Sequence, residues 1–512
     1  MPLQRDGLCP ASPGTSRATS MKPKEGLAGG LRILTWDAHS GIIRAKRVTA
    51  ILAAAVFVSG GCATIDLVRS REAAMAAKVA CSGVYVANRP YEHVLANDVL
   101  PIDQAVPFLS ALSNATFVHA AERKSVSVRT GSPLASSGIA AYRDNLGCAL
   151  LGAKWPETDP PLNCIPEHAA LPDAEWPAGN RRSLYPRQGY ETLYRAVRTH
   201  FEDGAGARAV VVVHHGRLVA EHYDSSLGLD QDSPLLGWSM AKTITGMLVG
   251  IEIGHQGVER SASDWIARWT APDPRAQIKV KDLLEMRSGL EWSEGYAAPN
   301  SNVNVMLLGK ANMSEYATES TLKHPPGKYW EYSSGTTNIL QLILRHKIES
   351  TGSFQDYCQF PYRSLFHRIG AYSARLEADA AGTYVGSSYL YATPRDWARL
   401  GMLMLHLGKW PPSGEQILPS HWIDESLPKH RAGEHRYGWQ TWGYLDDVDG
   451  AVYGQDLGLP EDAYHMRGHW GQSVTVVPSR DMIIIRLGWN VGTPYDAKSF
   501  VRSVLAAVGN EQ

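Results

Sequence analysis

The sequence has no excess of charge of either sign. Its 50 Lys and Arg residues nearly balance 51 Asp and Glu residues, and the formal net charge is −1. The chain also has no long basic run. Nucleic-acid binding requires clustered Lys and Arg that neutralise phosphates. The composition therefore argues against a nucleic-acid partner and favours a small-molecule or peptide-like substrate.

Cysteine is scarce, with six residues in 512, and no two of them form a C-x-x-C pair. Metal or redox chemistry through cysteine is therefore not expected. Four cysteines follow residue 62, and they allow three disulfide pairings that the sequence does not separate: Cys81, Cys148, Cys164 and Cys358. Disulfides would fit an oxidising compartment, and cysteines left unpaired would be buried thiols.

Two enzyme motifs are absent. The stretch around Ser239 lacks the second glycine of the G-x-S-x-G elbow, because Ala241 stands in its place, and this argues against an α/β-hydrolase. The glycines within 203–209 precede a strand and open no helix, so they form no dinucleotide-binding loop. His214 and His215 have no partners at metal-ligand spacing. We expect no cofactor and no metal.

The amino-terminal part has the layout of an export signal. Basic residues within 44–47 precede the apolar run 48–58, and small residues and Cys62 follow. The run has about half of the length that spans a bilayer, which favours a signal over a permanent helix. Its end resembles a bacterial lipoprotein box, in which Cys62 would carry lipid and tether the protein to the membrane. Ser59 departs from that box, so plain cleavage or an uncleaved anchor remains the alternative.

Four parts of the chain are predicted from these patterns. Residues 1–43 are expected to be disordered, or to come from a start site placed too far upstream. Residues 44–62 are the export signal, and 63–187 form an accessory region that ends in a proline-rich connector on the surface. Residues 188–508 are the main domain. We expect the protein in the periplasm, or anchored to a membrane, of a bacterium.

Strand patterns lie at both ends of the main domain, around a helical middle at 234–410. The segments with strand character are 207–223, 437–445, 473–479 and 482–488. Helices are predicted at 190–203 and at 496–508 by apolar residues at three- and four-residue spacing. The pattern predicts an α+β fold, with an antiparallel sheet flanked by helices and an inserted, mostly helical subdomain.

Ser239 and Lys242 form a Ser-x-x-Lys motif, which occurs three times in the chain. The copies that begin at Ser320 and Ser426 contain or soon meet proline, so only Ser239 stands ahead of a long apolar helix. Residues i and i+3 share a helix face, and burial can lower the pKa of a lysine enough to make it a base. On the motif alone, the alternative is that Ser239 is a helix cap and Lys242 a surface residue.

Two later motifs favour a catalytic role for Ser239 over the role of a helix cap. A Tyr-Ser-Ser segment begins at Tyr332, and a His-Trp-Gly-Gln segment begins at His469, ahead of a pair of strands. In this order the three motifs resemble the serine β-lactamase and penicillin-binding-protein superfamily. Within it the chain looks most similar to class C β-lactamases, carboxylesterases of that fold, D-aminopeptidase-type enzymes and 6-aminohexanoate-dimer hydrolases. The segments 278–292 and 391–410 also look like parts of this family.

The resemblance implies a β-lactamase/transpeptidase-like fold and a role for each motif residue. Ser239 would be the acylated nucleophile, Lys242 its proton acceptor, and Tyr332 the relay to the leaving group. The backbone N–H groups of Ser239 and Gln472 would form the oxyanion hole. The remaining motif residues would contact the substrate: Ser334, His469, Trp470 and Gly471.

Departures from the family pattern narrow the substrate. His469 stands where β-lactamases and D,D-peptidases usually have a lysine, and Ser334 stands where they have an asparagine. We therefore expect a serine hydrolase that cleaves an ester or linear amide through an acyl-enzyme on Ser239. The alternatives are a D,D-peptidase or β-lactamase acting on cell-wall peptides or β-lactams, and a catalytically silent envelope binding protein.

Three tryptophans lie within two residues of a motif position: Trp238, Trp330 and Trp470. They would either line an apolar substrate slot or pack beneath the site.

Overall fold

The computed structural model describes most of the chain after residue 60, except for the side chains of residues 61–66 and 104–105. The described ranges are 61–105, 112–131, 136–151, 163–182, 189–202, 206–427, 437–443, 459–492 and 495–509. The chain divides into two compact units, Met1–Leu67 and Val68–Gln512. The predicted extension 1–43 and residues 44–60 of the predicted export signal lie outside the described residues. None of the described helices is both long and apolar enough to cross a membrane.

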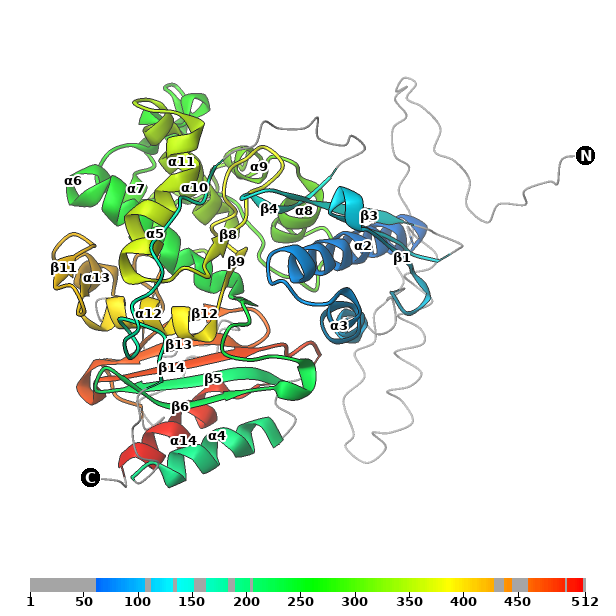
Figure 1. Cartoon of the computed structure of the whole chain (residues 1–512). Coiled ribbons are helices and arrows are strands. Elements are labelled where there is room, and N and C mark those ends of the chain that lie inside the picture. Colours follow the sequence, from blue (N-terminus) through cyan, green and yellow to red (C-terminus); the bar gives the residue numbers. More distant parts are fainter. Residues whose placement is uncertain are drawn as a thin grey trace, which may run out of the picture. The chain divides into compact units, whose positions relative to one another are not determined.

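A five-stranded antiparallel sheet organises the main domain (Figure 1). Its strands, in spatial order, are β12 (Tyr464–Gly468), β13 (Gln472–Val477), β14 (Met482–Gly488), β5 (Ala207–His214) and β6 (Arg217–Tyr223). Successive side chains of a strand point to opposite faces. Accordingly Val210 and Val212 join one hydrophobic cluster, whereas Val211 and Val213 join another. Both faces of the sheet are thus buried.

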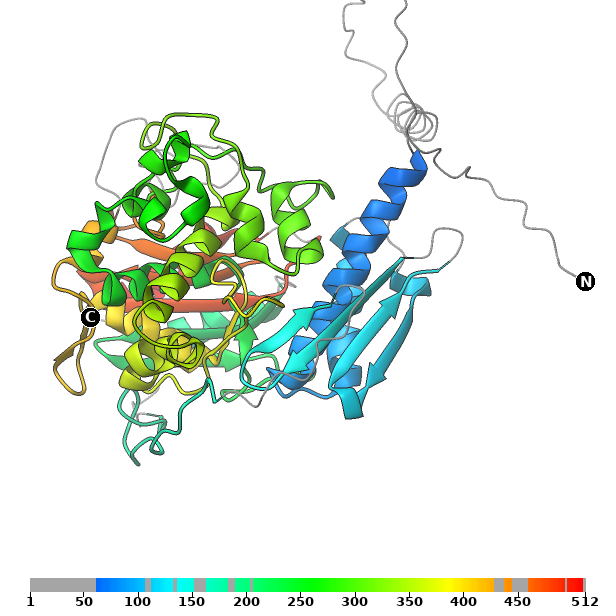
Figure 2. The same cartoon turned by 90° about the horizontal axis from the view of Figure 1, so that it is seen from above.

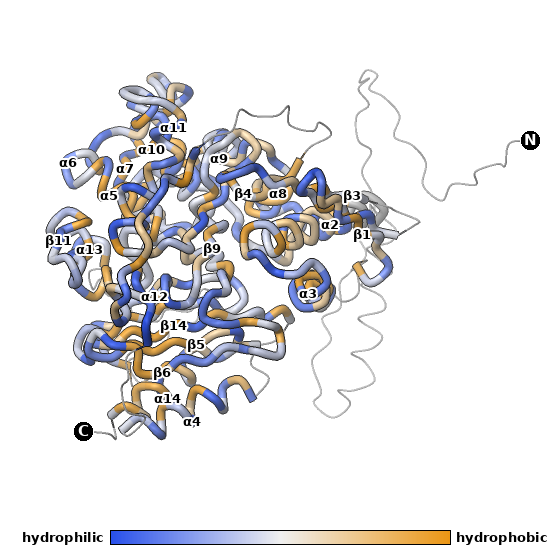
Figure 3. The backbone as a smooth tube through the Cα atoms, in the orientation of Figure 1, coloured by the Kyte–Doolittle hydropathy of each residue, from blue (hydrophilic) through white to orange (hydrophobic). Residues whose placement is uncertain are grey.

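Helices cover the two faces of this sheet. The terminal helices of the domain, α4 (Glu191–Glu202) and α14 (Ala497–Gly509), pack against each other on one face (Figure 1). Helix α12 (Pro394–Leu405) packs against β5, β13 and β14 on the other. Figure 3 shows the apolar character of the strands β5 and β14 between these layers. The predicted helices at both ends of the domain are therefore present.

The segment between β6 and β12 is mostly helical. Its helices are α5 (Ala241–Glu252), α6 (Gly254–Val258), α7 (Val280–Leu284), α8 (Asn302–Gly309), α9 (Met313–Thr318), α10 (Ser334–Glu349), α11 (Phe354–Pro361), α12 and α13 (Trp422–Ser426). Helix α10 is buried along most of its length and packs against α5, α7, α8, α9 and α11. Short strands complete the segment: β7 (Leu235–Leu236), β8 (Arg375–Leu376), β9 (Leu390–Ala392), β10 (Lys409–Trp410) and β11 (Glu415–Gln416).

The described part of the accessory region contains a long and a short α-helix and a four-stranded antiparallel sheet (Figure 2). Its elements are α2 (Gly61–Tyr85), α3 (Tyr91–Val94), β1 (Thr116–Ala120), β2 (Ser125–Arg129), β3 (Ser137–Arg143) and β4 (Gly147–Leu150). Gly138 of β3 lies directly against α2, because a Cβ at Gly138 would stand 2.4 Å from the Ala73 carbonyl oxygen. Small residues let these two backbones approach closely.

Two disulfides select one of the three possible pairings. Cys81 bonds to Cys148 and joins α2 to β4, and Cys164 bonds to Cys358 and joins the connector to α11. The described part of the connector is mostly exposed or half-buried, and a few buried residues anchor it in the domain. Trp176 is only 2% exposed, and its indole nitrogen donates to the Arg395 carbonyl.

The predicted fold class is confirmed, with one local correction. The segment 437–445 was expected to be a strand. Its described residues make only isolated bridges, between Tyr437 and Trp442 and between Trp442 and His465. Large aromatic side chains that pack on one another, rather than a continuous ladder, hold this segment in place.

Candidate active site

Ser239 lies on a tight turn at the start of α5. The turn spans Trp238–Met240, and Trp238 has a positive φ of 48° although it is almost fully buried. Gly237 leaves no room for a side chain, because a Cβ there would stand 2.3 Å from the Trp397 ring. Such strained backbone is retained where the surrounding structure fixes it, and it is common at active sites. Ser239 itself stays partly exposed.

Ser239 does not act as a helix cap. Helix α5 begins at Ala241, its N-cap position is Met240, and no side chain caps it. Lys242 is only 1% exposed and is therefore not a surface residue. The alternative of a serine cap followed by a surface lysine is wrong for this pair.

Lys242 makes three polar contacts inside the protein. Its Nζ lies 3.0 Å from Ser239 Oγ, 2.9 Å from Ser334 Oγ and 3.0 Å from the Ser387 carbonyl oxygen. Burial lowers the pKa of Lys242 to about 8, although the nearby Glu294 carboxylate opposes this shift. Lys242 can therefore exist as a neutral amine near physiological pH.

Tyr332 is brought to the same place. It stands just before α10, whose N-cap is Ser333. Its side chain lies within interaction range of Ser239, and Lys242 Nζ is 4.9 Å from the centre of its ring. Burial raises the pKa of Tyr332 above its ordinary value. The phenol is thus neutral and able to donate a proton at any ordinary pH.

Ser334 and Glu294 form the next layer around Lys242. Ser334 is fully buried, its hydroxyl donates to Glu294 Oε1, and its backbone N–H donates to Glu294 Oε2 at 2.9 Å. The indole nitrogen of Trp292 donates to the same carboxylate at 2.6 Å. The Ser334 hydroxyl, which we expected to contact substrate, is therefore engaged between Glu294 and Lys242.

The His-Trp-Gly-Gln segment forms the turn between β12 and β13. Trp470 and Gly471 both have positive φ, 59° and 85°. The Gln472 side chain closes this turn: its Nε2 donates to the carbonyls of His469, Trp470 and Gly488, and its Oε1 accepts from the Gly488 N–H at 2.9 Å. Gln472 thus fixes the turn through its side chain as well as starting an inner strand.

The edge of β12 lies against the turn that carries Ser239. A Cβ at Gly468 would stand 2.1 Å from the Gly237 carbonyl oxygen, so only glycine permits this approach. Both β12 and β13 contact the Trp238–Met240 turn. The backbones of Ser239 and Gln472, predicted to share an oxyanion hole, therefore belong to adjoining segments.

Aromatic rings surround His469. It stacks on Tyr296, with ring centres 4.4 Å apart, and it also meets Trp470 and Trp238. Burial lowers the pKa of His469 to about 4, so the ring is uncharged at neutral pH. His469 consequently differs from a lysine at this position in charge as well as in shape.

The three tryptophans near the motifs have different surroundings. Trp238 is 1% exposed and packs beneath the site, which fits the packing alternative. Trp470 is only partly buried and packs on Trp489. Trp330 belongs with Tyr332, Tyr437 and Trp442 to an aromatic cluster beside the candidate relay.

Glu294 and Ser387 were missed in the sequence. Glu294 stands two residues after the segment 278–292, which resembles the family. A carboxylate so close to that segment could have indicated a site residue. Ser387 contributes through its carbonyl, which any residue type supplies, so the sequence carried no signal for it. Cys62, the predicted lipidation site, lies where side chains are not described. Among the described residues, no group of three or more His, Cys, Asp or Glu could hold a metal.

Comparison with known proteins identifies the family of the chain. The family model described as Beta-lactamase matches residues 195–498, which is more than half of the chain. The chain belongs to this family of hydrolases, within the superfamily of serine β-lactamases and penicillin-binding proteins. A search of curated proteins found no match.

Several solved structures are similar. A putative 6-aminohexanoate-dimer hydrolase from Bacillus anthracis is 23% identical, with a TM-score of 0.49, over 61% of this chain and 80% of that one. A putative beta-lactamase from Bacteroides dorei is 14% identical, with a TM-score of 0.47, over 62% and 98%. A penicillin binding protein from Bacillus halodurans is 14% identical, with a TM-score of 0.44, over 61% and 99%.

Proposed function

We propose that the protein is a serine hydrolase that cleaves an ester or linear amide bond through an acyl-enzyme on Ser239. The observation that carries the proposal is the set of acceptors around Lys242. The Ser387 carbonyl can only accept a hydrogen bond. The Ser334 hydroxyl gives its own proton to Glu294, so it too accepts from Lys242.

This arrangement orients the base. A neutral amine has two N–H bonds and one lone pair. When Ser387 and Ser334 take the two N–H bonds, the lone pair faces the Ser239 hydroxyl, 3.0 Å away. Lys242 can then remove the serine proton as the oxygen attacks the carbonyl carbon, and a serine hydroxyl needs such a base to be an effective nucleophile.

The remaining steps use groups of the same cluster. The backbone N–H groups of Ser239 and Gln472 would bind the oxyanion of the tetrahedral intermediate. Tyr332 would pass the proton from Lys242 to the leaving alkoxide or amine, which departs and leaves the acyl group on Ser239. Water then attacks the acyl-enzyme with Lys242 again as base, and the acid product is released.

The surroundings of His469 support an ester or linear amide over a β-lactam. An uncharged His469, stacked on Tyr296, supplies no cation for the carboxylate that β-lactams and cell-wall peptides present. Trp470 beside it suits an apolar group of the substrate.

Comparison of substrates tests this proposal. Wild type and Ser239→Ala are assayed on a p-nitrophenyl ester, a linear p-nitroanilide and a chromogenic cephalosporin. We expect turnover of the ester or the anilide by wild type only, with the cephalosporin much slower. Full activity in Ser239→Ala would contradict the mechanism, and preferred hydrolysis of the cephalosporin would favour the β-lactamase alternative.

We also propose that the protein works outside the cytoplasm. The two disulfides support this, because such bonds persist in oxidising compartments. Metabolic labelling with a fatty-acid probe tests the tether: incorporation that is lost in Cys62→Ser is expected for a lipoprotein, and an unlabelled, secreted chain would exclude it.

A further inference from the structure

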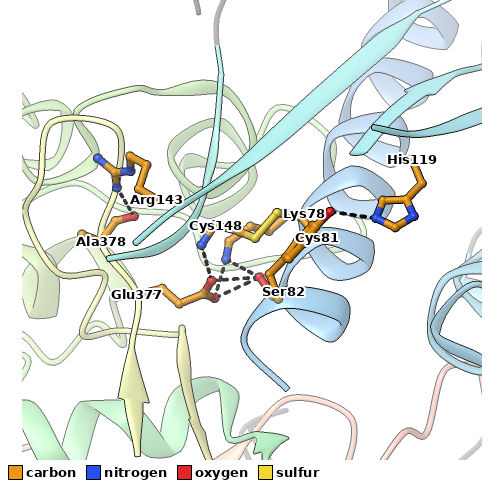
Figure 4. The surroundings of a disulfide bond; sticks show 9 residues. Lys78, Cys81, Ser82, His119, Arg143, Cys148, Glu377 and Ala378 are labelled. Carbon is orange, nitrogen blue, oxygen red and sulfur yellow. Dashed lines mark hydrogen bonds and ion pairs between the residues drawn. A yellow bond between two sulfur atoms is a disulfide. The ribbon is translucent and has the colours of Figure 1, made fainter. Parts of the chain in front are cut away.

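A buried ion pair joins the accessory region to the main domain (Figure 4). Lys78 of α2 binds the Glu377 carboxylate, which also accepts from Ser82 Oγ at 2.9 and 3.1 Å and from the Cys148 N–H at 2.7 Å. Glu377 is fully buried and Lys78 is 4% exposed. These partners of Glu377 all precede residue 195, where the family match begins.

This cluster makes Glu377 depend on the accessory region. Burying a carboxylate is costly unless it is paired and hydrogen-bonded. The groups that satisfy Glu377 come from α2 and β4, and the Cys81–Cys148 disulfide fastens these two elements together. The residues that hold Glu377 in place therefore lie outside the part of the chain that matches the family model.

The backbone of Glu377 in turn fixes a loop beside Lys242. Its N–H donates to the Tyr389 carbonyl at 2.9 Å, and its carbonyl accepts from the Val385 N–H at 2.9 Å. The Tyr389 ring also lies under Lys78, whose Nζ is 4.2 Å from the ring centre. Ser387 lies between these two anchored positions, and its carbonyl is the one that accepts from Lys242.

We propose that Glu377, held by Lys78 and Ser82, is a positioning residue for the general base. It fixes the loop 385–389 so that the Ser387 carbonyl takes one N–H of Lys242 and the lone pair stays directed at Ser239. This inference rests on the proposed function of Lys242. The accessory region then contributes to catalysis although it supplies no group that touches the substrate.

The proposal predicts a change in protonation as well as in rate. Glu294 and Tyr332 are the titratable groups that face Lys242. Arg143, Tyr389 and Tyr391 face the Lys78–Glu377 pair. Withdrawal of the Ser387 carbonyl removes an acceptor from the ammonium form of Lys242. The pKa of Lys242 would then fall further, while the amine loses its orientation.

The positioning role of Glu377 is tested by the rate at which a fluorophosphonate labels Ser239. The rate is measured by intact mass at several pH values around 8. The variants are Lys78→Met/Glu377→Gln, which replaces the ion pair by a neutral pair, and Ser82→Ala, which removes the hydroxyl that donates to Glu377 and accepts from Lys78. Lys124→Met is the control, because Lys124 forms an exposed ion pair on the same accessory sheet. We expect labelling of the double variant to slow by about 10- to 100-fold, with its midpoint at lower pH, and that of Ser82→Ala by about fivefold. Lys124→Met should match wild type.

The outcomes separate the two proposals. No labelling of folded wild type would overturn the function proposed for Ser239, and this inference with it. If wild type labels normally and the folded double variant has the same rate and midpoint, this inference alone is overturned. Loss of an ion pair with a purely structural role would lower the thermal stability and leave labelling unchanged. If the double variant does not fold, Ser82→Ala decides, and a wild-type rate there overturns the inference.

Discussion

Burial lowers the pKa of Lys242 to about 8, so this amine changes its protonation state within the range in which hydrolases are assayed. The protonated form has no lone pair and cannot act as a base. Activity is therefore expected to rise about tenfold per pH unit below that value and to level off above it. Ser334 and Glu294 also act on this amine. Because the Ser334 hydroxyl donates to Glu294, it accepts a hydrogen bond from Lys242 and orients one of its N–H bonds.

The variant Glu294→Gln tests the electrostatic part of this account. The Glu294 carboxylate favours the charged form of Lys242, so its neutralisation should lower the pKa of Lys242 further. The midpoint of the kcat/KM profile for ester hydrolysis is expected to move to lower pH. Glu291→Gln, a change at an exposed glutamate in the same loop, should leave it in place. A midpoint that stays or rises in Glu294→Gln would contradict the assignment.

At the scale of elements, the site depends on two turns that meet. The turn before α5 carries Ser239, and the β12–β13 turn carries Gln472. Gly468 lets the two turns approach closely at Gly237, and the packing around them retains the strained backbone at Trp238 and Trp470.

The variant Gln472→Met tests the second turn. It keeps the backbone N–H but removes the side-chain hydrogen bonds to His469, Trp470 and Gly488. A looser turn misplaces the oxyanion donor, so kcat should fall by about 10- to 100-fold with the fold retained. The control is Gln416→Met, which removes two side-chain hydrogen bonds to the carbonyls of Leu407 and Leu418. It should keep normal kcat. Equal kcat in both variants would show that the Gln472 side chain has no part in the site.

The same elements show how far sequence patterns reach. Continuous apolar runs within 207–223 and at 482–488 predicted the central strands, since β5 and β14 are buried on both faces of the sheet. The motif order predicted that Ser239, Lys242 and Tyr332 would meet. By contrast, Glu294 lies in a loop, Ser387 contacts Lys242 through its backbone carbonyl, and aromatic packing involves Tyr437 and Trp442. None of these has a local period, so tertiary contacts decide them.

At the scale of the whole molecule, residues 68–512 form one compact unit, although the family match begins at 195. The Cys164–Cys358 disulfide and the Lys78–Glu377 pair join the earlier residues to the rest. The sequence predicts 63–187 as a separate accessory region, because nothing in the composition of these residues reveals partners 200 or more residues away along the chain, such as Glu377 for Lys78.

A truncated chain that begins at residue 189 is therefore expected not to fold. It loses the partners of the buried Glu377, at a cost of about 3–5 kcal/mol, and it exposes the apolar surface that α2 covers. Circular dichroism and thermal unfolding, with a chain that begins at residue 63 as the control, would measure this. A cooperative unfolding transition in the truncated chain would contradict the expectation.

The central claim is that Lys242 activates Ser239. Its most direct test is the intact mass of the chain from residue 63 after treatment with a fluorophosphonate, with peptide mapping of the adduct. The account predicts a single adduct on Ser239 that forms readily above pH 8 and at least about 100-fold more slowly in Lys242→Ala. Absence of an adduct from the folded protein, or equal labelling in Lys242→Ala, would contradict it.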